Sequence, residues 1–89
     1  MATVNKYVIK AKGKFKPGEL VTTGQYAIIV WSYKDESMLY DYSGVLKVGE
    51  IAVVVDTIRF IETKLTMTKI ILSSGVSGYV FEMDLIPYE

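Results

Sequence analysis

Acidic side chains are the groups of this chain best suited to catalysis, because the sequence contains no histidine and no cysteine. Without imidazole or thiol, the usual general base, the commonest metal ligand and the thiol nucleophile are all excluded. The tight acidic groups are Asp35-Glu36, Asp41 and the pair Glu82 and Asp84. Catalytic carboxylates need a cleft and shifted pKa values, which surface turns of a small domain do not offer. We therefore expect no enzyme activity, no metal site and no cofactor.

Aromatic side chains are concentrated in the middle of the chain. Tyrosine and tryptophan suit binding surfaces because they combine a large contact area with a polar tip and few rotatable bonds. The alternative role is packing, in the core or as cross-strand aromatic pairs, and Trp31 fits that role best. We expect a loop of aromatic residues to bind a protein partner through Trp31, Tyr33, Tyr40 and Tyr42.

Lysines dominate the first sixteen residues, which contain no acidic side chain. Their spacing places most of them on one face of an extended chain, where they could follow a phosphate backbone. Against this, arginine is absent from the segment, the formal net charge of the chain is zero, and lysine also protects edge strands from aggregation. Nucleic-acid binding is therefore the alternative function, with contacts from Lys10, Lys12, Lys14 and Lys16, and Lys6 extending the same strip.

The elements that must position these residues are short β-strands, because valine, isoleucine, threonine and tyrosine alternate between closely spaced turn residues. The expected strands are Thr3–Lys10, Glu19–Thr23, Tyr26–Tyr33, Val45–Val48, Glu50–Phe60, Met67–Ser73, Ser77–Glu82 and Ile86–Tyr88, with Met38–Tyr42 as strand or ordered loop closed by Ser43-Gly44. A bend is expected near Asp56 and one 3₁₀ turn near Glu82 to Leu85.

The expected fold is a single all-β domain, a small barrel of about five to seven short antiparallel strands. Residues 1–16 form an N-terminal basic strand or arm, and residues 17–89 form the barrel. The segment Tyr26–Tyr33 is apolar on both faces. One face must be covered by a loop, by the N-terminal arm or by another protomer, so a homo-oligomer is a further hypothesis.

The second half of the chain resembles bacterial SH3-like domains of the SH3b type. Val45 to Glu50, followed by Ile51 to Val55, resembles their "x-L-x-x-G-x-x-h-x-V" segment. Thr68 to Leu72, with Gly75, Gly78-Tyr79-Val80 and Leu85, resembles their closing hairpin. The resemblance covers roughly Gly18 to Tyr88 and implies an SH3-like barrel, with Leu85 in the core and Tyr88 on the closing strand.

Three narrower resemblances bear on function. The chain resembles small phage-encoded SH3-like proteins, which implies a role in assembly, and bacterial SH3-like domains attached to hydrolases often bind cell-wall carbohydrate or peptide. Met38 to Tyr42 resembles the "ALYDY" segment of eukaryotic SH3 domains, which implies a polyproline groove. That family's groove tryptophan would fall near Met67 or Thr68, and Phe81 replaces its proline. One of the aromatic plates that polyproline recognition needs is therefore missing, which argues against such a groove.

The apolar stretches are too short to cross a bilayer, which takes about 20 residues. The longest, Ala27 to Trp31 and Ile51 to Val55, span five residues each. No segment has the pattern of a signal peptide. We expect a protein without a membrane segment that works in the cytoplasm, that of the host cell if it is phage-encoded.

Overall fold

The computed structural model describes the backbone of residues 3–5, 8–33 and 39–89, and the side chains of residues 8–32 and 42–89. Nine strands and one 3₁₀ turn make up this part of the chain. They are β1 (Thr3–Asn5), β2 (Val8–Lys10), β3 (Leu20–Thr22), β4 (Ile28–Tyr33), β5 (Leu39–Leu46), β6 (Ala52–Phe60), β7 (Thr66–Leu72), β8 (Ser77–Phe81), η1 (Glu82–Asp84) and β9 (Ile86–Pro87).

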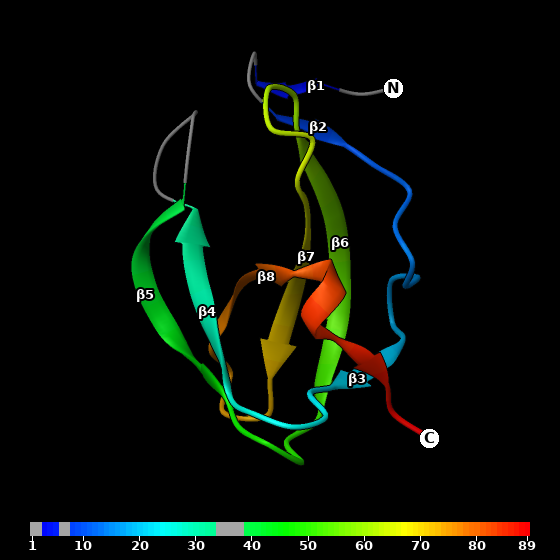
Figure 1. Cartoon of the computed structure of the whole chain (residues 1–89), viewed down its shortest axis with the longest axis vertical. Coiled ribbons are helices and arrows are strands. Elements are labelled where there is room, and N and C mark those ends of the chain that lie inside the picture. Colours follow the sequence, from blue (N-terminus) through cyan, green and yellow to red (C-terminus); the bar gives the residue numbers. More distant parts are fainter. Residues whose placement is uncertain (1–2, 6–7, 34–38) are drawn as a thin grey trace.

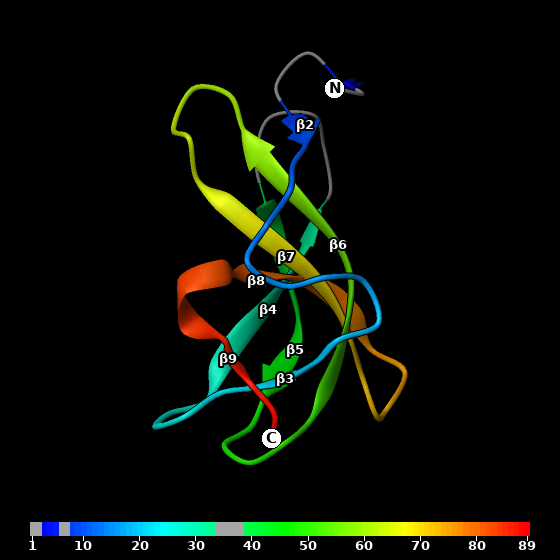
Figure 2. The same cartoon turned by 90° about the vertical axis from the view of Figure 1, so that its right-hand side faces the viewer.

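All strand pairs are antiparallel, and the sheet runs in the order β1-β2-β6-β7-β8-β4-β5. Strand β3 pairs with both β6 and β9 beside this path. Figures 1 and 2 show the sheet curling around its own axis, with β1 and β2 at one end of the molecule and β3 and β9 toward the other. Among the described residues no pairing joins β5 back to β1, so the sheet is a half-barrel. The predicted fold class, a small all-β barrel of short antiparallel strands, is confirmed.

Bulges explain how the longest strands curve. In β6, Val54 lies opposite Ile70 and Asp56 lies opposite Lys69, so Val55 is an extra residue. An extra residue bends a strand and increases its twist, which confirms the bend predicted near Asp56. Strand β5 also contains extra residues, because its pairing with β4 leaves out one residue of β5 at each of two places.

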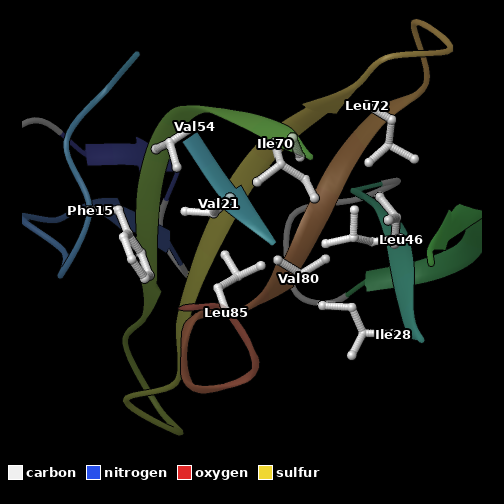
Figure 3. Close-up of a cluster of buried hydrophobic side chains, with 11 residues drawn as sticks. Phe15, Val21, Ile28, Leu46, Val54, Ile70, Leu72, Val80 and Leu85 are labelled. Carbon is white, nitrogen blue, oxygen red and sulfur yellow. The ribbon is translucent and has the colours of Figure 1, made fainter. Parts of the chain in front are cut away.

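The main core lies inside the curve of the sheet (Figure 3). Because side chains alternate along β7, Ile70 and Leu72 both point into this core. Leu85, the residue that follows η1, belongs to the same core. The whole set is Phe15, Val21, Ile28, Val30, Leu46, Ala52, Val54, Ile70, Leu72, Val80 and Leu85. Phe15 belongs to this core although it lies on the N-terminal side of residue 16. The division into residues 1–16 and 17–89 stays a prediction, and both sides of it contribute buried side chains.

A second, smaller core lies on the opposite face of the sheet. Met67 and Thr68 are consecutive buried residues of β7, so their side chains point to opposite faces of the sheet. The second core contains Val8, Ile58, Phe60 and Met67, with Trp31, Tyr79 and Phe81 packed against it.

Two strand predictions were wrong in detail. Thr3–Lys10 is not one strand, because β1 and β2 fold back on each other and pair Thr3 with Ile9. Ser43-Gly44 does not end a strand either, because β5 continues through it and absorbs Ser43 as an extra residue. The 3₁₀ turn and the final short strand were predicted and are confirmed.

Candidate partner-binding face

A row of side chains crosses five strands on the face that carries the second core. In register, Asp56 of β6 lies opposite Lys69 of β7, and Lys69 lies opposite Tyr79 of β8. Tyr79 then lies opposite Trp31 of β4, and Trp31 lies opposite Tyr42 of β5. Residues directly opposite one another project to the same face of a sheet. We call Asp56, Lys69, Tyr79, Trp31 and Tyr42 the cross-strand row.

The aromatic end of the cross-strand row is partly buried and partly open. Trp31 and Tyr79 are half-buried, since each packs with one side against the second core. Tyr42 is 65% exposed on the terminal strand β5. The structure thus brings together two residues that the sequence nominated for partner binding, Trp31 and Tyr42. The side chains of the other two, Tyr33 and Tyr40, lie outside the described residues.

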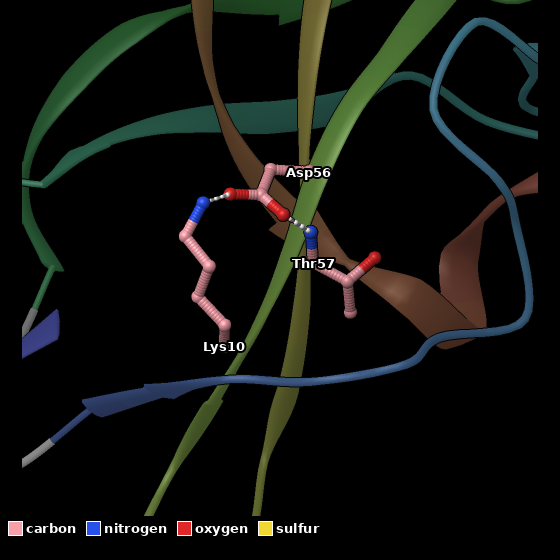
Figure 4. Close-up of polar contacts among 3 residues, drawn as sticks. All are labelled: Lys10, Asp56 and Thr57. Atoms are coloured by element: carbon pink, nitrogen blue, oxygen red, sulfur yellow. Dashed lines mark hydrogen bonds and ion pairs between the residues drawn. The ribbon is translucent and has the colours of Figure 1, made fainter. Parts of the chain in front are cut away.

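The charged end of the cross-strand row is organised around Asp56 (Figure 4). Lys10 Nζ lies 2.8 Å from Asp56 Oδ2, and the Thr57 backbone N–H donates to Asp56 Oδ1 at 2.9 Å. Burial raises the pKa of the Asp56 carboxyl, but the Lys10 and Thr57 hydrogen bonds and the charges of Lys10 and Lys69 outweigh it. The pKa of Asp56 is therefore lowered. The hydrogen bond to Asp56, reinforced by its charge, raises the pKa of Lys10.

Asp56→Asn should make stability less sensitive to acid. Because the pKa of Asp56 is lower in the folded protein than its ordinary 3.8, its carboxylate stabilises the fold above that value and stops doing so as the pH falls through the folded-state pKa. The pair is partly exposed, so we expect a loss below about 1 kcal/mol at pH 7, shrinking toward zero between about pH 5 and pH 2. Urea denaturation at several pH values measures this. Glu62→Gln, in the exposed turn after β6, is the control, and equal pH profiles for both variants would contradict the prediction.

A polar hollow of about 300 Å³ lies beside the middle of the cross-strand row. The described residues that line it are Ser32, Lys69, Ser77, Gly78 and Tyr79, and none of these five carries a carboxylate. Lys69 Nζ lies 6.0 Å from the centre of the Tyr79 ring, within the range of a cation–π contact. The hollow therefore offers an ammonium group and an aromatic ring to a ligand, and two serines belong to its lining.

The predicted strip of lysines is divided in the structure. Lys10 ends β2 and pairs with Asp56, whereas Lys12, Lys14 and Lys16 lie in the connection to β3. Since that connection is not a strand, no strand register fixes a common face for the three, although all three are exposed and alternate with the less exposed Ala11, Gly13 and Phe15. The backbone N–H groups of Lys14 and Lys16 donate to Glu82 Oε2 and Glu19 Oε1 at 2.6 and 3.0 Å. The side chain of Lys6 lies outside the described residues.

Sequence reasoning missed Asp56, Lys69 and Tyr79 as members of the site. Tyr79 was predicted only as part of the closing hairpin and not as a binding residue. A usable signal was present, since the short turn at Ser74-Gly75 joins two alternating strands and sets their register. That register places Lys69 opposite Tyr79.

The described side chains include no group of three or more that could hold a metal ion. Within the same residues, no helix has the length and apolar character needed to cross a bilayer. Comparison of the chain with protein families, curated proteins and solved structures gave no match.

Proposed function

We propose that this chain is a non-catalytic protein-interaction module that binds its partner through the cross-strand row. The observation that supports this most is the position of Trp31, half-buried against the second core and flanked by the exposed Tyr42. An aromatic ring fixed by a core loses little conformational freedom on binding, which favours its use as an anchor. The half-buried Tyr79 extends the same aromatic surface across β8.

Nucleic-acid binding stays the alternative, and the distribution of charge supports it less. A protein that follows a phosphate backbone gathers several uncompensated cations along one surface. Lys10 is compensated by Asp56, and Lys12, Lys14 and Lys16 lie in the connection between β2 and β3. The formal net charge of the chain is zero. Membership of the SH3-like family, a role in phage assembly, self-association and a cytoplasmic location stay predictions from the sequence.

Tyr42→Ala should weaken partner binding by about tenfold or more, the effect of removing an aromatic anchor, with little change in stability. The Tyr42 side chain is 65% exposed, so its removal should change the free energy of unfolding by at most about 0.5 kcal/mol. The binding probe is a peptide selected on the wild-type domain from a random library. Calorimetry measures its affinity, and circular dichroism follows thermal unfolding.

Tyr26→Ala is the matched control, because Tyr26 is 64% exposed but precedes β4 and lies outside the cross-strand row. It should leave peptide affinity unchanged. Equal affinities of the two variants would argue against the cross-strand row as the binding surface. A large fall in the melting temperature of Tyr42→Ala would instead show that Tyr42 supports the fold.

A further inference from the structure

The hollow beside the cross-strand row has the chemistry of an acceptor for one acidic side chain. We infer that it receives an aspartate or glutamate carboxylate from an extended segment of the partner protein, flanked by apolar residues. This inference rests on the proposed function and adds the chemistry of the partner. Lys69, Ser32 and Ser77 are the groups that would receive the carboxylate.

The positive charge of Lys69 favours a carboxylate as the ligand of the hollow. The carboxylate nearest to it in register, that of Asp56, already accepts hydrogen bonds from Lys10 and Thr57. Lys69 itself forms no salt bridge with any described residue, since the salt bridge of this part of the chain joins Lys10 to Asp56. Among the described side chains two lysines therefore share one aspartate, and the surplus positive charge of this set lies at the hollow. A carboxylate from a partner would balance it through a charge-assisted hydrogen bond.

The hydroxyl groups supply the second argument. The Oγ atoms of Ser32 and Ser77 make no hydrogen bond within the described part of the chain, although both residues line the hollow. Ser43 Oγ donates to the Ser77 carbonyl oxygen at 2.9 Å and holds β5 against β8 at this point. The two free hydroxyls can therefore donate to the oxygens of a bound carboxylate. One lysine suits a singly charged carboxylate better than a phosphate, which proteins usually bind with clustered arginines.

The surface next to the hollow is apolar, which favours a partner segment with apolar residues beside its acidic residue. Ile71 lies opposite Ser77 and is 41% exposed. Val53, opposite Ile71, and Leu20, opposite Val53, are 39% and 42% exposed. Ile71 and Lys69 are two residues apart on one strand, a separation of about 7 Å. Alternate residues of an extended partner segment have the same spacing. An acidic residue of the partner can therefore reach Lys69 while an apolar residue two positions away reaches Ile71.

The test uses the whole chain and peptides selected on it from a random library with blocked C-termini. We expect the selected peptides to carry an aspartate or glutamate beside apolar residues. Lys69→Gln should weaken their binding by about tenfold or more, and so should replacing the peptide's acid by its amide. The two changes together should weaken peptide binding little more than either change alone, because they remove the same contact. Trp31, the one tryptophan of the chain, reports binding through its fluorescence.

Lys47→Gln is the matched control, because Lys47 is an exposed lysine in the turn after β5, outside the hollow. It should bind as the wild type does. The acid-to-amide change in the peptide needs no variant protein, so the inference remains testable even if Lys69→Gln unfolds.

The outcomes separate this inference from the proposed function. Selected peptides that lack acids, or that bind Lys69→Gln as well as the wild type while still requiring Tyr42, would overturn the carboxylate site and leave the binding module intact. Failure to select any peptide would count against the module itself. Binding of a fluorescent single-stranded oligothymidylate that requires Lys69 and Tyr42 would replace the protein partner by a nucleic acid.

Discussion

Leu85→Ala should lower the free energy of unfolding by about 2–5 kcal/mol, the usual cost of removing a buried leucine side chain and leaving a cavity. Leu85 is 1% exposed and lies in the main core with Val21 and Val80 (Figure 3). A domain of 89 residues has a total stability of about 4–13 kcal/mol at the usual stability per residue. The variant should therefore lose a large part of its stability, and equilibrium urea denaturation measures the loss.

The position of Leu85 depends on the short turn before it. The Leu85 N–H donates to the Glu82 carbonyl oxygen at 3.2 Å, and the backbone then becomes extended. This geometry directs Leu85 inward while Met83, two residues earlier, is 82% exposed. Met83→Ala is the matched control and should change stability by at most about 0.5 kcal/mol. Similar losses for both variants would mean that the turn does not deliver Leu85 to the core.

The local features of the fold were predictable because they depend on residues close together in sequence. Gly75 has a φ of +91° in the turn between β7 and β8, a conformation that favours glycine, and the sequence placed a hairpin there. The apolar alternation on either side then predicted both strands. The bend at Asp56 and the burial of Leu85 followed from similar short patterns.

The cross-strand row was less predictable, because it depends on which distant strands become neighbours. Alternation places Trp31 on one face of its own strand, but it does not show that β4 pairs with β8. That pairing brings Tyr79 and Lys69 beside Trp31 across long stretches of sequence. Residues from the middle and the end of the chain therefore form one surface that neither segment indicates alone.

The lysine strip stays a prediction, because strand pairing fixes the position of Lys10 alone among its described members. Alternation places side chains on one face only while the chain stays extended. Strand β2 ends at Lys10, so beyond it a common face is supported only by the alternating exposure of Lys12, Lys14 and Lys16 and by no strand register. The partner of Lys10, Asp56, lies 46 residues away, and only the pairing of β2 with β6 brings them together.

Because β4 and β8 approach each other closely at Gly78, a larger residue there should strongly destabilise the fold. Gly78→Ala should lower the free energy of unfolding by about 3 kcal/mol, the upper range for overpacking a tight site. A Cβ atom at Gly78 would lie 2.6 Å from both the Trp31 carbonyl oxygen and Val30 Cγ1. The carbonyl belongs to the backbone, so β4 and β8 must separate to admit a methyl group. Urea denaturation measures the loss, and a change in Trp31 fluorescence should accompany it.

Gly24→Ala is the matched control for this change. A Cβ atom at Gly24 would meet only Ile86 Cδ1 at 3.4 Å, an ordinary contact, so its stability should stay within about 0.5 kcal/mol of the wild type. If Gly78→Ala were as stable as Gly24→Ala, β4 and β8 would not lie as close as Trp31 and Tyr79 require. The binding surface would then have no fixed centre, because the pairing of these two residues joins its aromatic end to its charged end.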